Sequence, residues 1–202
     1  MAKPSWLNVT PASGSGNGSI SNSASAHTGR VARTGTVTVT GVGVGVPATY
    51  KVTQTPKEEF ASFDNGAEMS APKSGGAVTV TGKTNSSKLT FRWNGEVTDV
   101  TIPETYQANG TATNNGEAIA DDPGAKAEFA FSIEFTFPAN ATIEEVDRVL
   151  IVEANGGQSQ QITIKQAAGD ATLSVEPTEI TIPQDGSAVS VQVTSNTNWT
   201  VS

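Results

Sequence analysis

The chain has 202 residues, of which 36% are apolar and 16% charged, enough to form a hydrophobic core in one large or two small domains. Its formal net charge of -8 repels phosphate backbones and anionic lipids, which argues against nucleic acid as a partner. Because it has no cysteine and no run of about 18 apolar residues, the sequence predicts no disulfide, no thiolate zinc site and no membrane insertion.

Alternation of apolar and polar residues recurs along the chain and predicts half-buried β-strands. The predicted strands are, in order, 36–40, 50–53, 78–81, 129–137, 162–164 and 189–193. Turns rich in Gly, Asn, Asp and Pro separate them, as at 13–18, 155–157 and 184–186. Only residues 141–147 leave open a single helical turn or a polar loop. Many short strands joined by such turns predict an all-β sandwich or barrel.

Internal repeats indicate how the strands are grouped. Segments 77–80 and 84–86 (AVTV and TNS) recur with the same spacing as 188–191 and 195–197 (AVSV and SNT). The segment from Arg33 to Gln54 likewise resembles the segment from Arg148 to Gln166, and both end on a glutamine that follows an alternating strand. The repeats predict a complete unit at 56–167. They also predict the back half of another unit at 1–55 and the front half of a third at 168–202.

The repeated elements resemble the BACON module, an immunoglobulin-like β-sandwich of Bacteroidota surface and secreted proteins and of some of their phages. Residues 173–183 and 195–201 are similar to its opening half, and residues 5–18, 33–36 and 52–54 to its closing half. The middle unit keeps the turn at Asn85 and the final Gln166, and it carries a long insertion around 103–125. The resemblance implies an all-β fold of tandem immunoglobulin-like, BACON-type sandwiches, one complete central unit flanked by two half units. It also implies carbohydrate binding.

A half sandwich cannot bury its inner face, so residues 1–55 and 168–202 each need a partner. An odd number of strands places the two ends of the central sandwich at opposite poles, which keeps the flanks of one chain apart. We expect either that the chain continues beyond Ser202 or that successive chains pair head to tail in fibres or rings. The first alternative is favoured for the C-terminus, because Ser202 falls within an apparent strand.

Catalytic and metal-binding patterns are weak throughout, and the sequence predicts a non-enzymatic protein with no metal and no cofactor. His27 is the only histidine and is expected in a surface loop. Residues 121–122 fit a solvated turn better than a calcium loop, and the carboxylates of 144–147 fit exposed charge better than an acid and base pair. Residues 41–47 predict a flexible hairpin rather than a phosphate loop, because no lysine or helix start follows.

Aromatic residues are the best candidates for a glycan site, since flat rings pack on sugar faces and amides satisfy sugar hydroxyls. Trp6 and Trp199 lie in strand contexts of the family and are expected in or near the core. A second group lies at a turn and in the insertion. The predicted glycan-binding residues are Trp93, Tyr106, Asn109 and Asn114.

Two functions follow from these observations. The first is a structural and adhesive component of a phage virion surface, such as a head fibre, decoration or tail appendage. Its partners would be neighbouring copies of itself, other virion proteins and cell-surface or mucosal glycans. The alternative is a glycan-binding or spacer module of a secreted Bacteroidota glycoside hydrolase or surface lipoprotein, located outside the cell or on its surface. Residues 1–7 contain no apolar signal region, so the sequence as written predicts no signal-peptide export.

Overall fold

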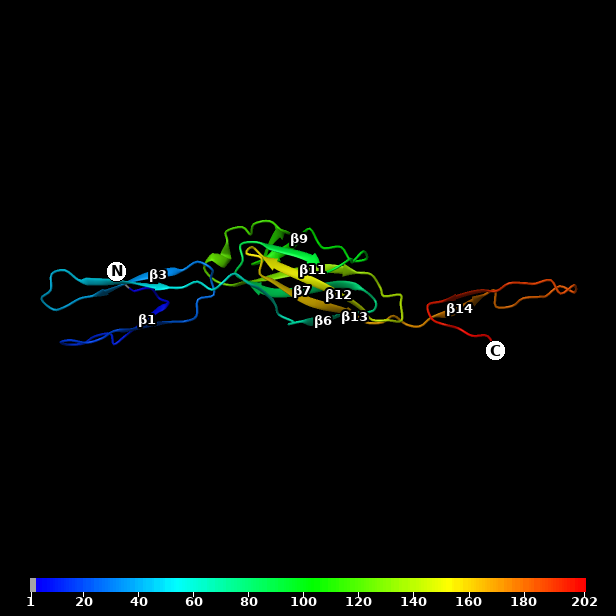
Figure 1. The fold of residues 1–202 in the computed structure, drawn as a ribbon, viewed down its shortest axis with the longest axis horizontal. Helices are drawn as coiled ribbons and strands as arrows, with labels where there is room; N and C mark the ends of the chain where they lie inside the picture. The colour runs from blue at the N-terminus through cyan, green and yellow to red at the C-terminus, as the bar shows by residue number, and fades with distance from the viewer. Residues whose placement is uncertain (1–2) are drawn as a thin grey trace.

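A computed structural model describes residues 3–202, and three parts follow one another along its longest axis (Figure 1). We call residues 3–55, with β1–β4, the N-terminal flank; residues 56–167, with β5–β13, the central sandwich; and residues 168–202, with β14 and β15, the C-terminal flank. Among residues 3–202 the only helical element is the 3-10 turn η1 at Pro123–Ala125, so the predicted all-β class is confirmed.

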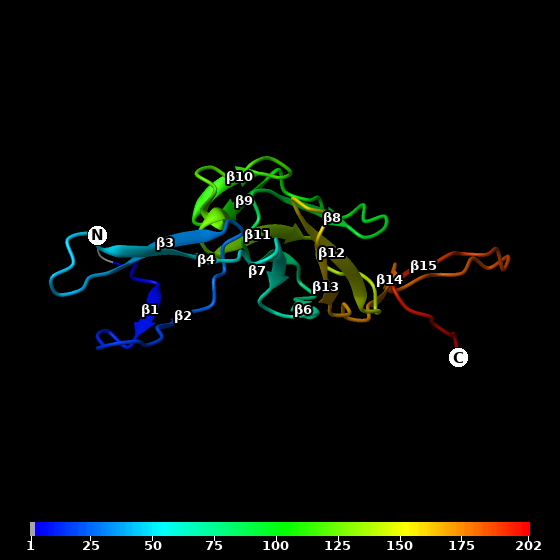
Figure 2. The same ribbon diagram turned by 60° about the vertical axis from the view of Figure 1, so that its left-hand side comes forward.

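The central sandwich consists of a five-stranded and a four-stranded sheet (Figure 2). The first sheet has the order β10-β9-β11-β7-β5, with bounds Thr111–Asn114, Thr105–Ala108, Phe129–Phe137, Gly76–Thr84 and Ala61–Phe63. The second has the order β6-β13-β12-β8, with bounds Glu68–Ala71, Ser159–Gln166, Val146–Ala154 and Leu89–Trp93. All neighbours pair antiparallel except β6, which runs parallel to β13. The arrangement is consistent with an immunoglobulin-like sandwich.

β11 is the central strand of the first sheet, and its apolar and polar residues alternate strictly. Its sequence FAFSIEFTF buries every second side chain, while Glu134 and Thr136 point to solvent. All nine of its residues pair with β7, from Phe129 opposite Thr84 to Phe137 opposite Gly76. Each fully buried side chain of this kind stabilises the fold by about 1.5 to 3 kcal/mol. The hydrophobic core therefore lies between the two sheets of the central sandwich.

The segment predicted as an insertion is part of the sandwich. Residues 103–125 contain β9, β10 and η1, and β9 extends the five-stranded sheet by pairing Ala108 with Phe131 of β11. Tyr106 and Ile119 are buried in the core. The segment reads as an insertion because its strands are short and separated by Asn-rich turns, yet it covers one edge of the core.

The two flanks are two-stranded ribbons. In the N-terminal flank, β1 (Leu7–Thr10) pairs with β2 (Ser21–Ala24), and β3 (Arg33–Val39) pairs with β4 (Ala48–Gln54). In the C-terminal flank, β14 (Leu173–Glu176) pairs with β15 (Gln192–Ser195), and no residue of that flank is buried. The predicted strand at 189–193 is wrong in its first half. A strand forms only where a neighbour pairs with it, and residues 189–191 have none among residues 3–202.

The flanks leave the central sandwich at opposite ends (Figure 1). The β3–β4 ribbon projects from one pole and the β14–β15 ribbon from the other. The division of the chain into half units stays a prediction, but the flanks of one chain do not meet in this structure. Within residues 141–147, left open as a helical turn or loop, residues 141–145 form a loop of bends, and Val146 and Asp147 begin β12.

Candidate functional site

The four predicted glycan-binding residues lie in different surroundings. Tyr106 is only 2% exposed, and its ring packs edge-on against Phe91 with 5.0 Å between centroids. Burial raises the pKa of its hydroxyl to about 12, an effect that the nearby backbone of Leu89 partly offsets. The hydroxyl has no hydrogen-bond partner of ordinary geometry. Alternation along β9 points this ring into the core, so its face is not open to stack on a sugar.

Trp93 is half-buried at the end of β8. Its indole Nε1 donates to the carbonyl of Val100 at 2.8 Å, and its ring lies 5.1 Å from that of Phe135. Asn109 and Asn114 are exposed in the β9–β10 hairpin, on the other sheet. The structure does not bring these four residues together, and sugar binding by them stays a prediction.

The remaining polar candidates lie in loops or at contacts between parts. His27 makes a hydrogen bond of 2.8 Å between its Nε2 and the carbonyl of Val31. Asp122 forms an ion pair with Arg30, so this carboxylate joins the N-terminal flank to the central sandwich. Within residues 3–202, no group of three or more His, Cys, Asp or Glu side chains could hold a metal ion. No helix in the described part of the chain is long and apolar enough to cross a membrane.

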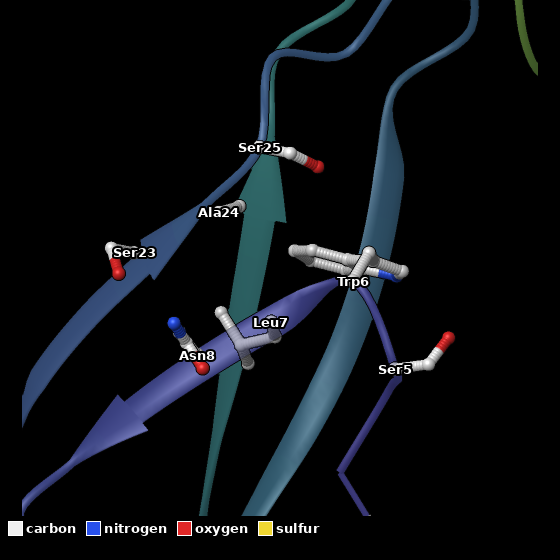
Figure 3. A pocket seen from close by; sticks show the side chains of 7 residues that line it. All are labelled: Ser5, Trp6, Leu7, Asn8, Ser23, Ala24 and Ser25. Atoms are coloured by element: carbon white, nitrogen blue, oxygen red, sulfur yellow. The ribbon is translucent and has the colours of Figure 1, made fainter.

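A hollow of about 410 Å³ opens on the N-terminal flank between the start of β1 and the end of β2 (Figure 3). Its lining residues are Ser5, Trp6, Leu7, Asn8, Ser23, Ala24 and Ser25. The Arg33 guanidinium lies 4.7 Å from the centroid of the Trp6 ring, in a cation–π contact. Trp6 is half-buried, as expected, and the surrounding hydroxyl and amide groups are exposed. The hollow therefore combines an aromatic ring with polar groups.

Beside this hollow, a glutamine at the end of β4 joins the two ribbons of the flank. Arg33 Nε donates to Gln54 Oε1 at 2.9 Å, and Gln54 Nε2 donates to the carbonyl of Ser25 at 2.8 Å. The second N–H of the Gln54 amide has no partner in the described part of the chain.

The central sandwich contains the same arrangement with every group satisfied. Arg148 Nη1 donates to Gln166 Oε1 at 3.1 Å, and Gln166 Nε2 donates to the carbonyl of Pro138 at 2.7 Å. The second N–H of Gln166 donates to the carbonyl of Pro72 at 3.2 Å. Arg148 also pairs with Asp99, which holds the pKa of that carboxyl below its usual value. The flank thus lacks the acceptor that Pro72 provides in the complete sandwich.

An asparagine holds each junction between successive parts. Buried Asn85 accepts a hydrogen bond from Phe60 N at 2.9 Å, and its Nδ2 donates to the carbonyls of Thr28 at 3.2 Å and Glu58 at 3.0 Å. Its side chain therefore joins the N-terminal flank to the central sandwich.

The same bonds recur at the second junction, where the sequence repeat places Asn196 in the position of Asn85. Asn196 accepts from Thr172 N at 2.8 Å and donates to the carbonyls of Ala141 and Asp170, both at 2.9 Å. The neighbouring hydroxyl repeats as well, since Ser195 Oγ donates to the carbonyl of Thr172 at 2.8 Å. This matches Thr84 Oγ1 at the first junction, which donates to the carbonyl of Phe60. The sequence repeat is thus accompanied by a repeated hydrogen-bond pattern.

Apolar side chains of the C-terminal flank are exposed at positions whose counterparts are buried. The repeat that aligns Asn196 with Asn85, a shift of 111 residues, pairs Ile180 with Met69, Ile182 with Ala71, Val189 with Val78, and Val191 with Val80. The hydrogen bonds that match Thr172 to Phe60 shift the preceding strand by one residue more, which pairs Leu173 with Ala61 and Val175 with Phe63. The flank members are 38% to 63% exposed. Their counterparts are at most 9% exposed, apart from Met69, which packs partly buried against the core. Trp199, expected in or near the core, is 50% exposed, because no other part of the described chain covers its ribbon.

Sequence reasoning identified the repeated asparagines and glutamines but not what they bond. The partners are backbone carbonyls, which no sequence pattern marks. Proline recurs in register with the repeated asparagines, at Pro72 and Pro183, and this recurrence could have indicated one of the partners.

Comparison with known proteins gives one match, in the N-terminal flank. Residues 2–57 match the family model described as the viral BACON domain, so this segment is similar to that family. No curated protein matches the chain.

Proposed function

We propose that this chain, whose residues 2–57 match the viral BACON family model, is a non-enzymatic structural component of a phage particle surface, such as a head fibre, a decoration or a tail appendage. The viral BACON match is the observation that carries the proposal. Modules of this family are non-catalytic, which favours a structural role over an enzymatic one. The elongated succession of β-ribbons and sandwich is suited to projecting from a particle.

Immunogold electron microscopy tests the location. Particles of the phage that encodes the chain would be purified on a density gradient and labelled with antibodies raised against the central sandwich. We expect gold on the outside of intact particles, at one type of structure, with no label on particles treated with pre-immune serum. Label confined to the lysate, with none on the particles, would contradict the proposal and favour a secreted glycan-binding or spacer module.

The hollow beside Trp6 favours glycan binding as an additional role. A half-buried indole next to serine hydroxyls and the Asn8 amide offers both a stacking surface and hydrogen-bond groups. On a glycan array, Trp6→Ala should lose any bound sugar, while Trp93→Ala should keep it, because the Trp93 indole is engaged within the central sandwich. The opposite pattern would instead favour the residues predicted from sequence, and an array with no signal for the parent chain would remove this role.

A further inference from the structure

The outer edge of β4 is an unpaired β-edge. Among the described residues, β4 pairs only with β3. In the central sandwich, the equivalent edge of β13 pairs in parallel with β6: Thr163 N donates to the carbonyl of Ala67 at 2.8 Å, and Ala167 N to that of Ala71 at 3.2 Å. An open edge of this kind presents a row of N–H and C=O groups that can pair with another strand.

The chain also contains an unpaired counterpart of β6. Residues 179–182 are the repeat equivalent of β6 and form no strand in this structure. They follow β14 just as β6 follows β5, and they carry two exposed isoleucines, Ile180 and Ile182. The N-terminal flank therefore lacks a strand that the C-terminal flank possesses.

We propose that the C-terminal flank of one copy of this chain docks on the N-terminal flank of a second copy and completes a BACON sandwich between them. Residues 179–182 add to the outer edge of β4, in the manner of strand addition. Residues 187–190 are the repeat equivalent of the start of β7, and they add beside β2 in the way that β7 lies beside β11. The paired strands β15 and β14 follow in the same sheet.

The register follows from the central sandwich. There, Thr163 to Gln166 pair with Glu68 to Ala71. Aligning Gln54 with Gln166 and Asn196 with Asn85 transfers these pairs to Lys51 with Glu179, Val52 with Ile180, Thr53 with Thr181, and Gln54 with Ile182. Opposite charges then lie directly across from each other at Lys51 and Glu179. In the central sandwich the residue across from Glu68 is Thr163, and Glu68 forms its ion pair with Lys165, two residues further along β13, at 3.1 Å.

The glutamine at the end of β4 gains its missing acceptor in this register. Pro72 O accepts from Gly75 N at 3.0 Å within its own turn and also from Gln166. Pro183 O accepts from Gly186 N at 2.9 Å in the same kind of turn. Pro183 of the second copy is thus placed to accept the free N–H of Gln54, as Pro72 accepts that of Gln166.

A second copy carries the segment that matches the open edge in register and in charge. The flanks of one chain project from opposite poles, so its C-terminal flank does not reach its own N-terminal flank (Figure 1). The contact joins two different surfaces, and such head-to-tail contacts repeat into rods or rings. The proposal goes beyond a location on a phage particle, and its test in solution is independent of that location.

Single cysteines test the register, because the chain has none of its own. Thr53→Cys and Thr181→Cys change two exposed residues that the register places side by side. Mixed and oxidised, they should form at least about tenfold more disulfide-linked heterodimer than Thr181→Cys mixed with Thr38→Cys, since disulfides need Cα atoms within about 7 Å. Thr38 is exposed on β3, away from the open edge. Equal yields from the two mixtures would overturn the proposal.

Blocking one end at a time tests polarity. Thr53→Pro removes an N–H of the open edge, where proline is tolerated, and Ile182→Asp places a charge on an exposed side chain. In light-scattering measurements the parent chain should grow in mass with concentration, each variant should stay monomeric, and their mixture should form a 1:1 dimer and nothing larger. Circular dichroism confirms that each variant keeps its strands. A parent chain that remains monomeric at millimolar concentration, or a mixture that fails to dimerise, would refute the head-to-tail contact.

Discussion

Replacing Asn85 by alanine should destabilise the central sandwich strongly. The side chain is fully buried, and three of its hydrogen bonds are 3.2 Å or shorter: from Phe60 N, to Thr28 O and to Glu58 O. Each such bond contributes about 1 kcal/mol net, and a buried N–H left without a partner costs about 1 to 3 kcal/mol. We therefore expect Asn85→Ala to lower the free energy of unfolding by about 2 to 4 kcal/mol.

Urea unfolding followed by tryptophan fluorescence measures this loss. Trp93 lies in the central sandwich, whereas the other two tryptophans, Trp6 and Trp199, lie in the flanks. In a background carrying Trp6→Phe and Trp199→Phe, the emission of Trp93 alone reports on the central sandwich.

The matched control is Asn196→Ala, which removes the same set of bonds from the second junction. Asn196 is only half-buried and lies in a flank without buried residues, so water can replace its bonds. The unfolding of the central sandwich should then change by less than about 0.5 kcal/mol. Equal effects of the two substitutions, or an Asn85→Ala chain as stable as its parent, would show that burial does not set the strength of these junctions.

Three further predictions concern the central sandwich. Gly82→Ala should lower its stability by about 1 to 3 kcal/mol in the same urea assay, because a Cβ there overlaps the carbonyl of Ser62. Tyr106→Phe should leave the stability of the central sandwich unchanged or raise it, because the substitution removes a buried hydroxyl without a hydrogen-bond partner. The parent, unlike this variant, should also lose stability above about pH 10, because the tyrosine ionises at a lower pH in the unfolded chain than in the fold. Asp99 has a lowered pKa, so its contribution is complete above about pH 4 and is lost on further acidification. Asp99→Asn should flatten that acid dependence and cost about 1 to 2 kcal/mol at pH 7, less than for a buried pair because the carboxylate is 46% exposed, while Arg148 stays buried. Thermal melts from pH 2 to 11 check both pH predictions.

The sequence predicted a strand correctly where its pairing neighbours lie in the same part of the chain. The alternation of residues 129–137 predicted β11 correctly, because both neighbours of that strand are in the same sandwich. The same alternation at 189–191 forms no strand, since period-2 patterning indicates which side chains share a face but does not supply the neighbour that buries them.

The candidate site was harder to predict than the fold. Tyr106 was a candidate glycan-binding residue because it lies in an apparent insertion, and its burial depends on β9 joining β11 far along the chain. The polar contacts of Asn85 and Gln166 end on carbonyl oxygens of distant segments. Backbone acceptors are present at every residue, so the sequence cannot show which ones a buried amide selects.

The chemistry of the two junctions has an evolutionary consequence. Asn85 binds the main chain of Thr28, and Asn196 binds that of Ala141, so the same connection tolerates a hydroxylated side chain in one place and a methyl group in the other. Because this hydrogen bond does not depend on the identity of the partner side chain, recombination can exchange one domain for an unrelated one without new substitutions at the junction. Chains of this type can gain, lose or exchange whole domains while each junction keeps its hydrogen-bond geometry.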